Sequence, residues 1–339
     1  NLLSVEPNWQ KELANSFTDP EDLLSYLDLP VAKYKQHIKA RRLFPMRVPS
    51  FFASLMAKGE PNDPLLKQVL PLADEFLEVD GFVTDPLEEL ENAKDGIVHK
   101  YHNRLLLIVK GGCAVNCRYC FRRHFPYAEH QNNKAEWSEH FAYIHAHTEL
   151  DEIILSGGDP LMSNDVHIAW LIEQIEAVPH IKRLRIHTRL PVVIPNRVTE
   201  QFAQLLANSR LQSIVVLHIN HPNEISPELV SKVLVLKQNN VTVLNQAVLL
   251  KDINANAETQ MALNEALFSA GIMPYYLHMF DQVKGAHHFA VTDAEAIAIM
   301  QEVIKQQSGY MIPKLVREIG GEPSKTPINL DVSTNIKYG

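Results

Sequence analysis

The residues best able to do chemistry are three cysteines that lie within eight residues: Cys113, Cys117 and Cys120. The sequence contains no other cysteine. On one loop, this Cys-x3-Cys-x2-Cys spacing lets three thiolates bind three irons of a four-iron cluster, because thiolate is the ligand that such clusters take. The fourth iron would then be free to chelate S-adenosylmethionine and pass one electron to its sulfonium. The motif therefore predicts a [4Fe–4S] cluster that generates a 5′-deoxyadenosyl radical.

Two other interpretations of the cysteines are a zinc site completed by His124 or His130, and three buried thiols without a metal. Tetrahedral zinc usually draws on paired Cys-x2-Cys or His arms, and no second arm stands out in the sequence. An odd, clustered set of thiols is also a poor disulfide framework. Reducing cytoplasm is the natural compartment for free thiols, so we expect a cytoplasmic protein.

Composition excludes some classes of partner. Of the 339 residues, 46% are hydrophobic and 21% charged, which is ordinary for a globular protein. The net charge is -8 and the Lys and Arg residues are scattered, so we expect no nucleic-acid partner. No apolar run approaches the length of a membrane span, so we expect no membrane partner either.

Strands alternating with helices must position the cysteine loop. Six apolar, β-branched-rich runs predict strands at 105–109, 152–155, 183–187, 213–219, 241–248 and 273–279. Helical spacing follows each run, near 135–147, 165–177, 199–208, 227–238, 257–270 and 292–306. Capping residues such as Thr199, Ser226 and Thr292 precede three of these helices. The alternation predicts right-handed βα units around a parallel sheet.

Polar residues follow every predicted strand, which favours one shared site. They are Cys113, the run 157–159, Arg189, His218 with Asn220, Gln246 and Asp281. Because βα barrels carry their active sites at the carboxyl ends of the strands, we expect a partial (β/α)6 barrel with these residues at its mouth. An open doubly wound sheet is the alternative. Residues 1–100 read as a mainly helical extension, 101–310 as the barrel and 311–339 as a C-terminal segment.

A glycine-rich loop adds to the cysteine signal. Ser156, Gly157, Gly158 and Asp159 directly follow the second predicted strand. Glycine there would allow backbone to approach the methionine amine of S-adenosylmethionine closely, with Asp159 as a partner for that amine. Together with the cysteine spacing, this loop resembles the radical S-adenosylmethionine (radical SAM) superfamily, whose members carry Gly-Gly-Glu/Asp at this place.

Longer segments resemble the lysine 2,3-aminomutases, and specifically the branch that serves elongation factor P modification. The resemblance is carried by 43–49 (LFPMRVP), 80–87 (DGFVTDPL), 99–104 (HKYHNR) and 320–327 (GGEPSKTP). It implies an isomerase that moves the α-amino group of L-lysine to carbon 3 with pyridoxal 5′-phosphate as a second cofactor. An amine cannot move between adjacent carbons of a radical, but an imine formed with pyridoxal phosphate can.

The same resemblance assigns roles to individual residues. Lys325 would form the Schiff base to pyridoxal phosphate, although a lysine on a Gly/Pro loop is ordinarily solvated. Lys100, Tyr101 and Arg104 match the segment that binds the phosphate. Arg122 matches the arginine that binds the substrate carboxylate, for which a planar guanidinium is suited. Two carboxylates, Asp281 and Glu318, match the pair that holds the substrate ε-ammonium, with Glu318 standing where the family has aspartate. His218 and Gln246 match positions near the adenosyl group, and His218 could equally be a hydrogen-bonded histidine at the barrel rim.

The resemblance implies that the product is (R)-β-lysine, supplied to elongation factor P through a separate β-lysine ligase. It also implies an electron donor such as flavodoxin. Two rival functions stay open: an aminomutase for another amino acid, such as glutamate or arginine, and a non-catalytic iron–sulfur sensor or electron carrier. A pair of carboxylates favours a substrate with a cationic side chain over glutamate, and a sensor has no need of a Schiff-base lysine.

Overall fold

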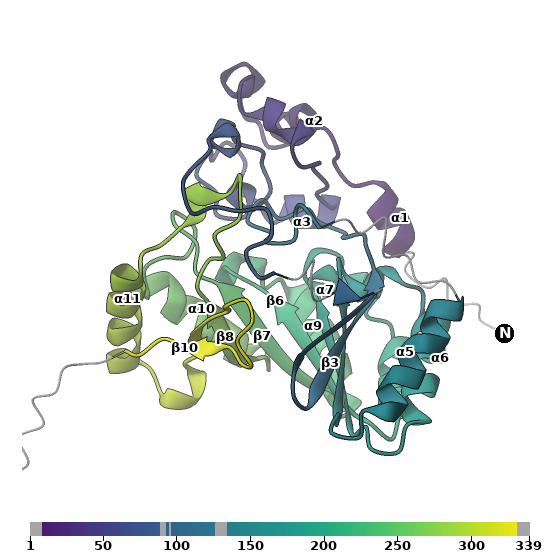
Figure 1. Ribbon diagram of the computed structural model, residues 1–339. Helices are drawn as coiled ribbons and strands as arrows, with labels where there is room; N and C mark the ends of the chain where they lie inside the picture. Colours follow the sequence, from purple (N-terminus) through teal and green to yellow (C-terminus); the bar gives the residue numbers. More distant parts are fainter. Residues whose placement is uncertain (1–8, 89–92, 95, 126–133, 331–339) are drawn as a thin grey trace, which may run out of the picture.

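The computed structural model describes residues 9–88, 93–94, 96–125 and 134–330 (Figure 1). A ten-stranded sheet forms its centre, and neighbouring strands follow one another in sequence order. The strands are β1 (Ala93–Lys94), β2 (Ile97–Tyr101), β3 (Arg104–Lys110), β4 (Glu152–Gly157), β5 (Arg183–Thr188), β6 (Gln212–His218), β7 (Thr242–Val248), β8 (Met273–His278), β9 (Lys314–Arg317) and β10 (Thr326–Pro327). From β3 to β9 the strands pair in parallel, whereas β1, β2 and β10 pair antiparallel at the two edges.

Helices connect the parallel strands, as predicted. They are α5 (Lys134–Ala146), α6 (Asp165–Glu176), α7 (Leu190–Val193), α8 (Glu200–Ala207), α9 (Pro227–Gln238), α10 (Ala257–Ser269) and α11 (Asp293–Gln306). The predicted caps are present: the side chains of Thr199, Ser226 and Thr292 accept backbone N–H bonds from Phe202, Leu229 and Glu295. These bonds satisfy donors that the first turn of a helix otherwise leaves free, so the sequence fixes where each helix begins.

The strand order distinguishes the two predicted architectures. A doubly wound sheet reverses its strand order at a switch point, and this sheet does not. Strands added in sequence order by right-handed units build a barrel wall instead. Every residue of β4 is buried, as expected for a strand covered on both faces. The predicted α/β fold of the partial-barrel type is confirmed, and β9 extends the parallel wall by one strand that the sequence patterns did not indicate.

The N-terminal segment is built from short helical turns. They are α1 (Trp9–Ala14), α2 (Pro20–Tyr26), η1 (Val31–Tyr34), η2 (Ile38–Arg42), α3 (Ser50–Ser54), η3 (Leu66–Gln68) and η4 (Ala73–Phe76). They lie at the top of Figure 1, and backbone bonds join them to the cysteine loop: Asn116 N donates to Arg47 O at 3.0 Å, and Arg118 N to Gln68 O at 2.8 Å. The segment therefore covers the loop that carries the cysteines. No helix within the described ranges has the length and apolar character needed to cross a membrane.

Candidate active site

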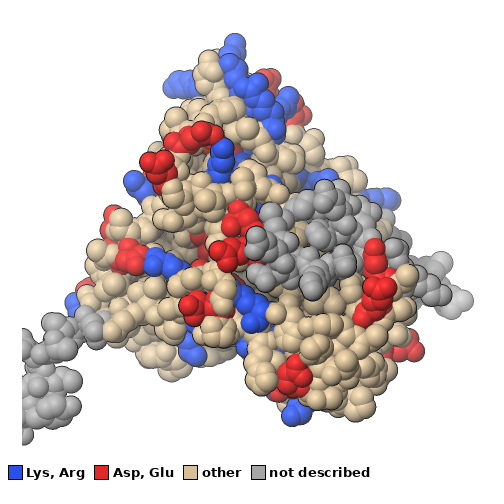
Figure 2. Space-filling view, viewed as in Figure 1, with Lys and Arg blue, Asp and Glu red and all other residues tan. Residues whose placement is uncertain are grey.

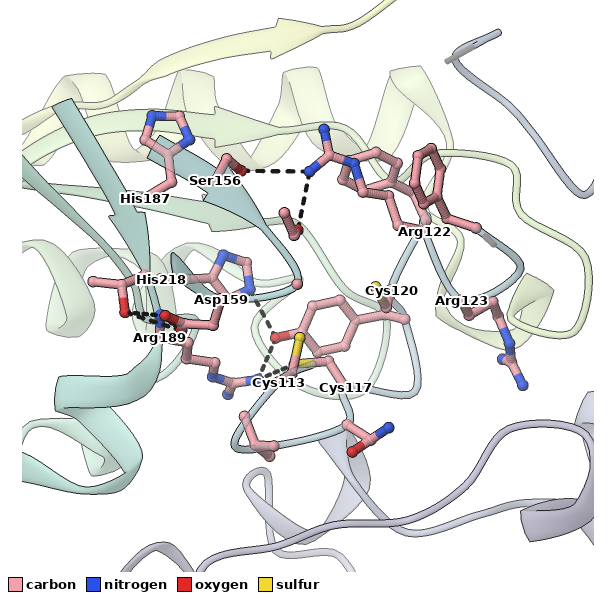
Figure 3. Close-up of a pocket in the computed structure, with 18 of the residues that line it drawn as sticks. Cys113, Cys117, Cys120, Arg122, Arg123, Ser156, Asp159, His187, Arg189 and His218 are labelled. Carbon is pink, nitrogen blue, oxygen red and sulfur yellow. Dashed lines mark hydrogen bonds between the residues drawn. The ribbon is translucent and has the colours of Figure 1, made fainter. Parts of the chain in front are cut away.

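A cavity of about 860 Å³ lies where the carboxyl ends of the strands meet the N-terminal segment. Nearly all of the residues predicted for the site line it, and Figure 3 shows several of them facing one another. The predicted residues in its wall are Tyr101, Arg104, Cys113, Cys117, Cys120, Arg122, Ser156, Gly157, Gly158, Asp159, His218, Gln246, Asp281, Glu318 and Lys325. Lys100 is adjacent, since its Nζ pairs at 3.4 Å with Oε1 of Glu318, which lines the cavity.

The three cysteine thiols face this cavity from the loop after β3. Burial raises the pKa of Cys113 well above its ordinary value and that of Cys120 to about 11. Buried thiols of this kind become thiolates when positive charge is near them, such as the irons of a cluster. Within the described ranges no three His, Cys, Asp or Glu side chains gather closely enough to hold one metal ion. A four-iron cluster needs no such meeting point, because each thiolate binds its own iron.

A buried arginine contacts the cysteine loop from the end of β5. Arg189 donates through one nitrogen to Cys117 Sγ and to Tyr119 Oη, both at 2.7 Å (Figure 3). Through its other nitrogen it donates to Gln68 Oε1 at 2.7 Å and to Glu224 Oε2 at 2.9 Å. Burial disfavours its charge, but Cys117, Tyr119 and Glu224 outweigh burial and raise the pKa of Arg189 above its ordinary value. A permanent positive charge therefore lies beside Cys117, one of the predicted cluster ligands.

The glycines of the loop after β4 permit close backbone packing against the loop after β3. A side chain at Gly158 would place its Cβ 2.6 Å from Gly112 O, and one at Gly157 would lie 2.3 Å from Lys110 O. Gly158 N donates to Lys110 O at 2.7 Å, and Asp159 N to Gly112 O at 3.0 Å. Both glycines thus set the position of the segment that leads into Cys113, in addition to any contact with a cofactor.

Asp159 uses its carboxylate within the protein. It accepts from Thr188 Oγ1 at 2.8 Å and from the backbone nitrogens of Leu161, Arg189 and Leu190 at 2.8 to 3.0 Å. Burial raises its pKa, against the lowering effect of these bonds. Its direct pairing with the methionine amine stays a prediction, while its observed bonds join the loop after β4 to the start of α7.

His218, at the end of β6, forms a hydrogen bond to Tyr119 Oη at 2.8 Å, and the two rings stack with centroids 5.7 Å apart (Figure 3). Burial lowers the pKa of His218 well below its ordinary value, so the ring is neutral at physiological pH. It is a hydrogen-bonded histidine at the barrel rim that also lines the cavity, so the two interpretations from sequence are compatible.

Lys325 and Glu318 form an ion pair in another part of the cavity wall. Glu318 also accepts from Tyr101 Oη at 2.8 Å and pairs with Lys100 Nζ at 3.4 Å. Burial acts to raise the pKa of Glu318, but Lys325, Lys100 and Tyr101 together lower it well below its ordinary value. The Arg104 guanidinium lies 3.9 Å from the centroid of the Tyr101 ring. We call the three cations Lys100, Arg104 and Lys325 the lysine end. Together they suit an anionic, phosphate-bearing ligand.

Arg122 and Asp281 complete the predicted set. Arg122 Nη1 donates to Gly157 O at 3.2 Å and Ser156 Oγ at 3.4 Å, so its guanidinium lies against the glycine loop (Figure 3). Asp281 follows β8 and lines the same cavity. The structure therefore places a guanidinium and two carboxylates, Asp281 and Glu318, around one space.

Several cavity residues were not identified from the sequence as part of the site. Arg185, His187, Tyr276 and His278 line it from β5 and β8. Burial lowers the pKa of His278 to about 3, so this ring adds no charge. Alternation along the strands could have indicated these four residues, because alternate residues of a barrel strand face its interior. Arg185 and His187 alternate on β5, and Tyr276 and His278 alternate on β8.

A second missed group holds the cysteine loop from the N-terminal side. The buried carboxylate of Glu75 accepts from Arg118 Nε at 2.9 Å and Arg123 Nη2 at 2.6 Å, and it pairs with Arg118 Nη2 as well. Arg118 and Arg123 flank Cys120 in sequence. Glu75 therefore joins the N-terminal segment to residues on both sides of Cys120, a predicted cluster ligand, and no sequence pattern connects residues so far apart.

The fold and the cysteine loop define a radical SAM enzyme, and the sequence profile of the Radical SAM superfamily matches residues 107–256. Membership of that superfamily implies a [4Fe–4S] cluster and S-adenosylmethionine, which the three cavity-lining cysteines fit. A radical SAM methyltransferase of known structure from Sphaerobacter thermophilus is similar at 15% identity and a TM-score of 0.45, over 65% of this chain and 68% of that one.

Two curated relatives are much closer. L-lysine 2,3-aminomutase of Escherichia coli (strain K12) is 55% identical over 96% of this chain and 95% of its own length. The enzyme of the same name from Haemophilus influenzae is 53% identical over 96% of each chain. This chain belongs to the lysine 2,3-aminomutase family of isomerases.

Proposed function

We propose that the protein converts L-α-lysine into (R)-β-lysine. The observation that carries this proposal is the cavity itself, in which three cysteines, a lysine end, an arginine and two carboxylates surround one space. The names of the Escherichia coli and Haemophilus influenzae relatives support lysine as the substrate. Aminomutases for arginine or glutamate are the alternatives; a carboxylate pair at Asp281 and Glu318 disfavours glutamate.

The second cofactor in this proposal is pyridoxal phosphate, which supplies the conjugated system that lets a nitrogen migrate between adjacent carbons. Lys325 would hold it covalently, and Lys100, Tyr101 and Arg104 would surround its phosphate. The donor set fits that group: a partly buried lysine with further cations and a tyrosine hydroxyl beside it. Cations bound to phosphate form strong, charge-assisted hydrogen bonds.

The substrate would lie between its two ends. Arg122, held against the glycine loop by Gly157 O, would take the α-carboxylate near the cluster. Asp281 and Glu318 would take the ε-ammonium. Glu318 is also the partner of Lys325, so the substrate ammonium and the lysine ammonium compete for the same carboxylate. Covalent attachment of a cofactor to Lys325 would replace its ammonium, which has three donors, with an imine nitrogen that has at most one, and so free Glu318 to bind substrate.

The proposed destination of the product is elongation factor P, through a β-lysine ligase, in the cytoplasm. The identity to the Escherichia coli relative supports this branch of the family. An external one-electron donor completes the scheme, because the cluster must be reduced before it can cleave S-adenosylmethionine.

Anaerobic incubation of the reconstituted protein with lysine, S-adenosylmethionine, pyridoxal phosphate and dithionite tests the reaction. Chiral chromatography should show (R)-β-lysine, and parallel incubations with arginine and glutamate should show no β-amino acid. If S-adenosylmethionine were cleaved and no β-lysine formed, the radical chemistry would be supported and lysine would be refuted as the substrate. Cluster absorbance without pyridoxal absorbance after reconstitution would favour the iron–sulfur sensor or carrier instead.

A further inference from the structure

One segment of this acidic protein is strongly basic. Between Leu29 and Gly59 the chain has seven Lys or Arg residues and no Asp or Glu, although the whole chain carries a net charge of -8. Elsewhere in the chain the Lys and Arg residues are scattered among acidic ones. Its cations are Lys33, Lys35, Lys39, Arg41, Arg42, Arg47 and Lys58.

Most of these cations lie on the surface of η1 and η2. Lys33, Lys35, Lys39 and Arg42 are exposed, and we call these four residues the basic cap. Figure 2 shows Lys and Arg side chains gathered over the N-terminal segment at the top of the view. Within the cap Lys39 contacts Gln36 and Arg42 lies over the Phe76 ring, so neither charge is offset by these contacts. Arg41, by contrast, pairs with Asp19 at 2.6 Å.

The chain leads directly from the basic cap to the cluster loop. Five residues after Arg42, the side chain of Arg47 donates to Cys113 O at 3.1 Å, and Arg47 O accepts from Asn116 N at 3.0 Å. Arg118 Nη1 donates to Phe44 O at 2.8 Å. Arg42 also lines the cavity that the three cysteines face. The positive surface and the cysteines are thus two sides of one packed unit.

The chemistry of the site requires an electron from outside this unit. The chain has three cysteines, and all three are assigned to the one cluster, so it offers no thiolates for a second cluster to relay the electron. A reductant must therefore approach this cluster itself. Opposite charge raises the rate of such encounters and orients the partners, and electron-transfer complexes bury small interfaces.

We propose that the basic cap is the docking surface for an acidic one-electron carrier protein that reduces the cluster. The proposal rests on the proposed function only in requiring the cluster and its reduction. In the encounter the carrier loses one electron and the cluster gains it, and no bond is made or broken. The acidic face of the carrier lies against η1 and η2, next to the residues that bond to the cluster loop.

The test compares the wild-type protein with a variant carrying Lys33→Glu, Lys35→Glu and Lys39→Glu. Reduced flavodoxin is mixed anaerobically with each reconstituted protein, and loss of the cluster's visible absorbance gives the reduction rate. At low salt the variant should be reduced at least about tenfold more slowly, because steering by opposite charge typically contributes 10-fold or more. The wild-type rate should fall as salt rises, and the variant rate should change little.

A matched control carries the same change in charge elsewhere: Lys182→Glu, Lys237→Glu and Lys314→Glu. These exposed lysines lie at or near the opposite ends of β5, α9 and β9 from the cavity. The control should match wild type, and dithionite should reduce all three proteins equally. Equal slowing of both variants, or equal flavodoxin rates for wild type and the cap variant, would overturn the proposal.

Two further outcomes distinguish this proposal from a nucleic-acid site at the basic cap and from the proposed reaction itself. If the cap variant keeps its flavodoxin rate but loses salt-sensitive binding to tRNA that wild type shows, the cap is a nucleic-acid site and the proposal fails. If flavodoxin reduction depends on the cap while no β-lysine forms with dithionite, docking stands and the proposed reaction falls. Iron content and circular dichroism confirm that the variants are folded, and a Lys33→Gln, Lys35→Gln, Lys39→Gln variant should give an intermediate rate.

Discussion

The guanidinium of Arg189 donates a hydrogen bond to Sγ of Cys117 at 2.7 Å, so a buried cation touches a predicted cluster ligand directly. Its other bonds reach Tyr119 in the cysteine loop, Gln68 in the N-terminal segment and Glu224 after β6. One side chain therefore links the cysteine loop, the barrel wall and the N-terminal segment. Hydrogen bonds to cluster sulfurs and nearby charge are known determinants of reduction potential.

Replacing Arg189 with glutamine should lower the reduction potential of the cluster. The bond and the positive charge stabilise the reduced, more negative cluster more than the oxidised one, and a hydrogen bond to a charged group contributes about 1.5–3 kcal/mol. The oxidised cluster also gains part of this stabilisation, so only the difference between the two oxidation states changes the potential. For a one-electron couple, 59 mV corresponds to a tenfold change in the equilibrium constant, and we expect a decrease of roughly a few tens of millivolts. A redox titration followed by electron paramagnetic resonance measures it. The control is Arg210→Gln, because Arg210 donates to backbone oxygens remote from the cavity. An unchanged reduction potential in Arg189→Gln would show that Arg189 does not tune the cluster electrostatically.

Lys325→Ala should prevent covalent retention of pyridoxal phosphate and leave the cluster intact. The lysine ammonium faces Glu318 in the cavity, and without it no amine at that place can bond the cofactor aldehyde. Absorbance of the desalted protein should lack the pyridoxal contribution and keep the iron–sulfur contribution, with activity reduced at least about a hundredfold. Lys314→Ala, an exposed lysine on β9, should keep both contributions. Pyridoxal retained by Lys325→Ala would mean that another lysine holds it.

Glu318→Gln should weaken lysine binding and change how the stability of the cofactor-free protein depends on pH. The depressed pKa of Glu318 means that its stabilising contribution is fully present above the ordinary carboxyl pKa of 4.5 and is lost only as pH falls through the lower native value. Wild type should exceed the variant by roughly 1.5–3 kcal/mol at neutral pH. Denaturant titrations at neutral pH and at several pH values well below 4.5 check this, and KM for lysine should rise at least about tenfold at constant cluster content. Glu318→Asp, which keeps the negative charge on a shorter side chain, should keep most of the activity; loss equal to that of Glu318→Gln would contradict a charge-based role.

Glu75→Gln should destabilise the protein and loosen the cysteine loop. Removing one partner of a buried ion pair leaves uncompensated charge, which costs about 3–5 kcal/mol, and here two arginines lose their partner. Chemical denaturation of the apoprotein should show the loss. The control is Glu78, which lies three residues after Glu75 and forms an exposed ion pair with Lys284. Glu78→Gln breaks only that exposed pair and should leave the unfolding midpoint unchanged. Similar midpoints for the two variants would show that the Glu75 cluster contributes little.

Gly158→Ala should prevent assembly of the cluster in an otherwise folded barrel. The added Cβ would lie 2.6 Å from Gly112 O, so the segment leading to Cys113 must move. Iron content after reconstitution should fall below half, with far-ultraviolet circular dichroism unchanged. Gly309→Ala, where the structure leaves open space for a Cβ, is the control and should bind iron normally.

The elements were predictable because their signals are local. A capping residue acts on a nitrogen three positions away, and β-branched runs separated by helical spacing mark the strands within one or two residues. The cysteine loop and the glycine loop were also predictable, because each is recognised from the spacing of residues within one short segment. The bonds of Asp159 to the start of α7, the contact between Arg189 and Cys117 and the ion pairs of Glu75 join residues from different segments, and no period in the sequence encodes them.

The sheet order has a consequence for folding. Each parallel strand pairs with its neighbour in sequence, so the barrel wall can form through contacts of modest chain separation. The N-terminal segment differs: Gln68 donates to Glu224 across 156 residues, and Arg189 reaches back to Gln68 across 121. The portion of the chain that the ribosome makes first must therefore wait for most of the rest before it finds its partners, and the covered cysteine loop is completed last.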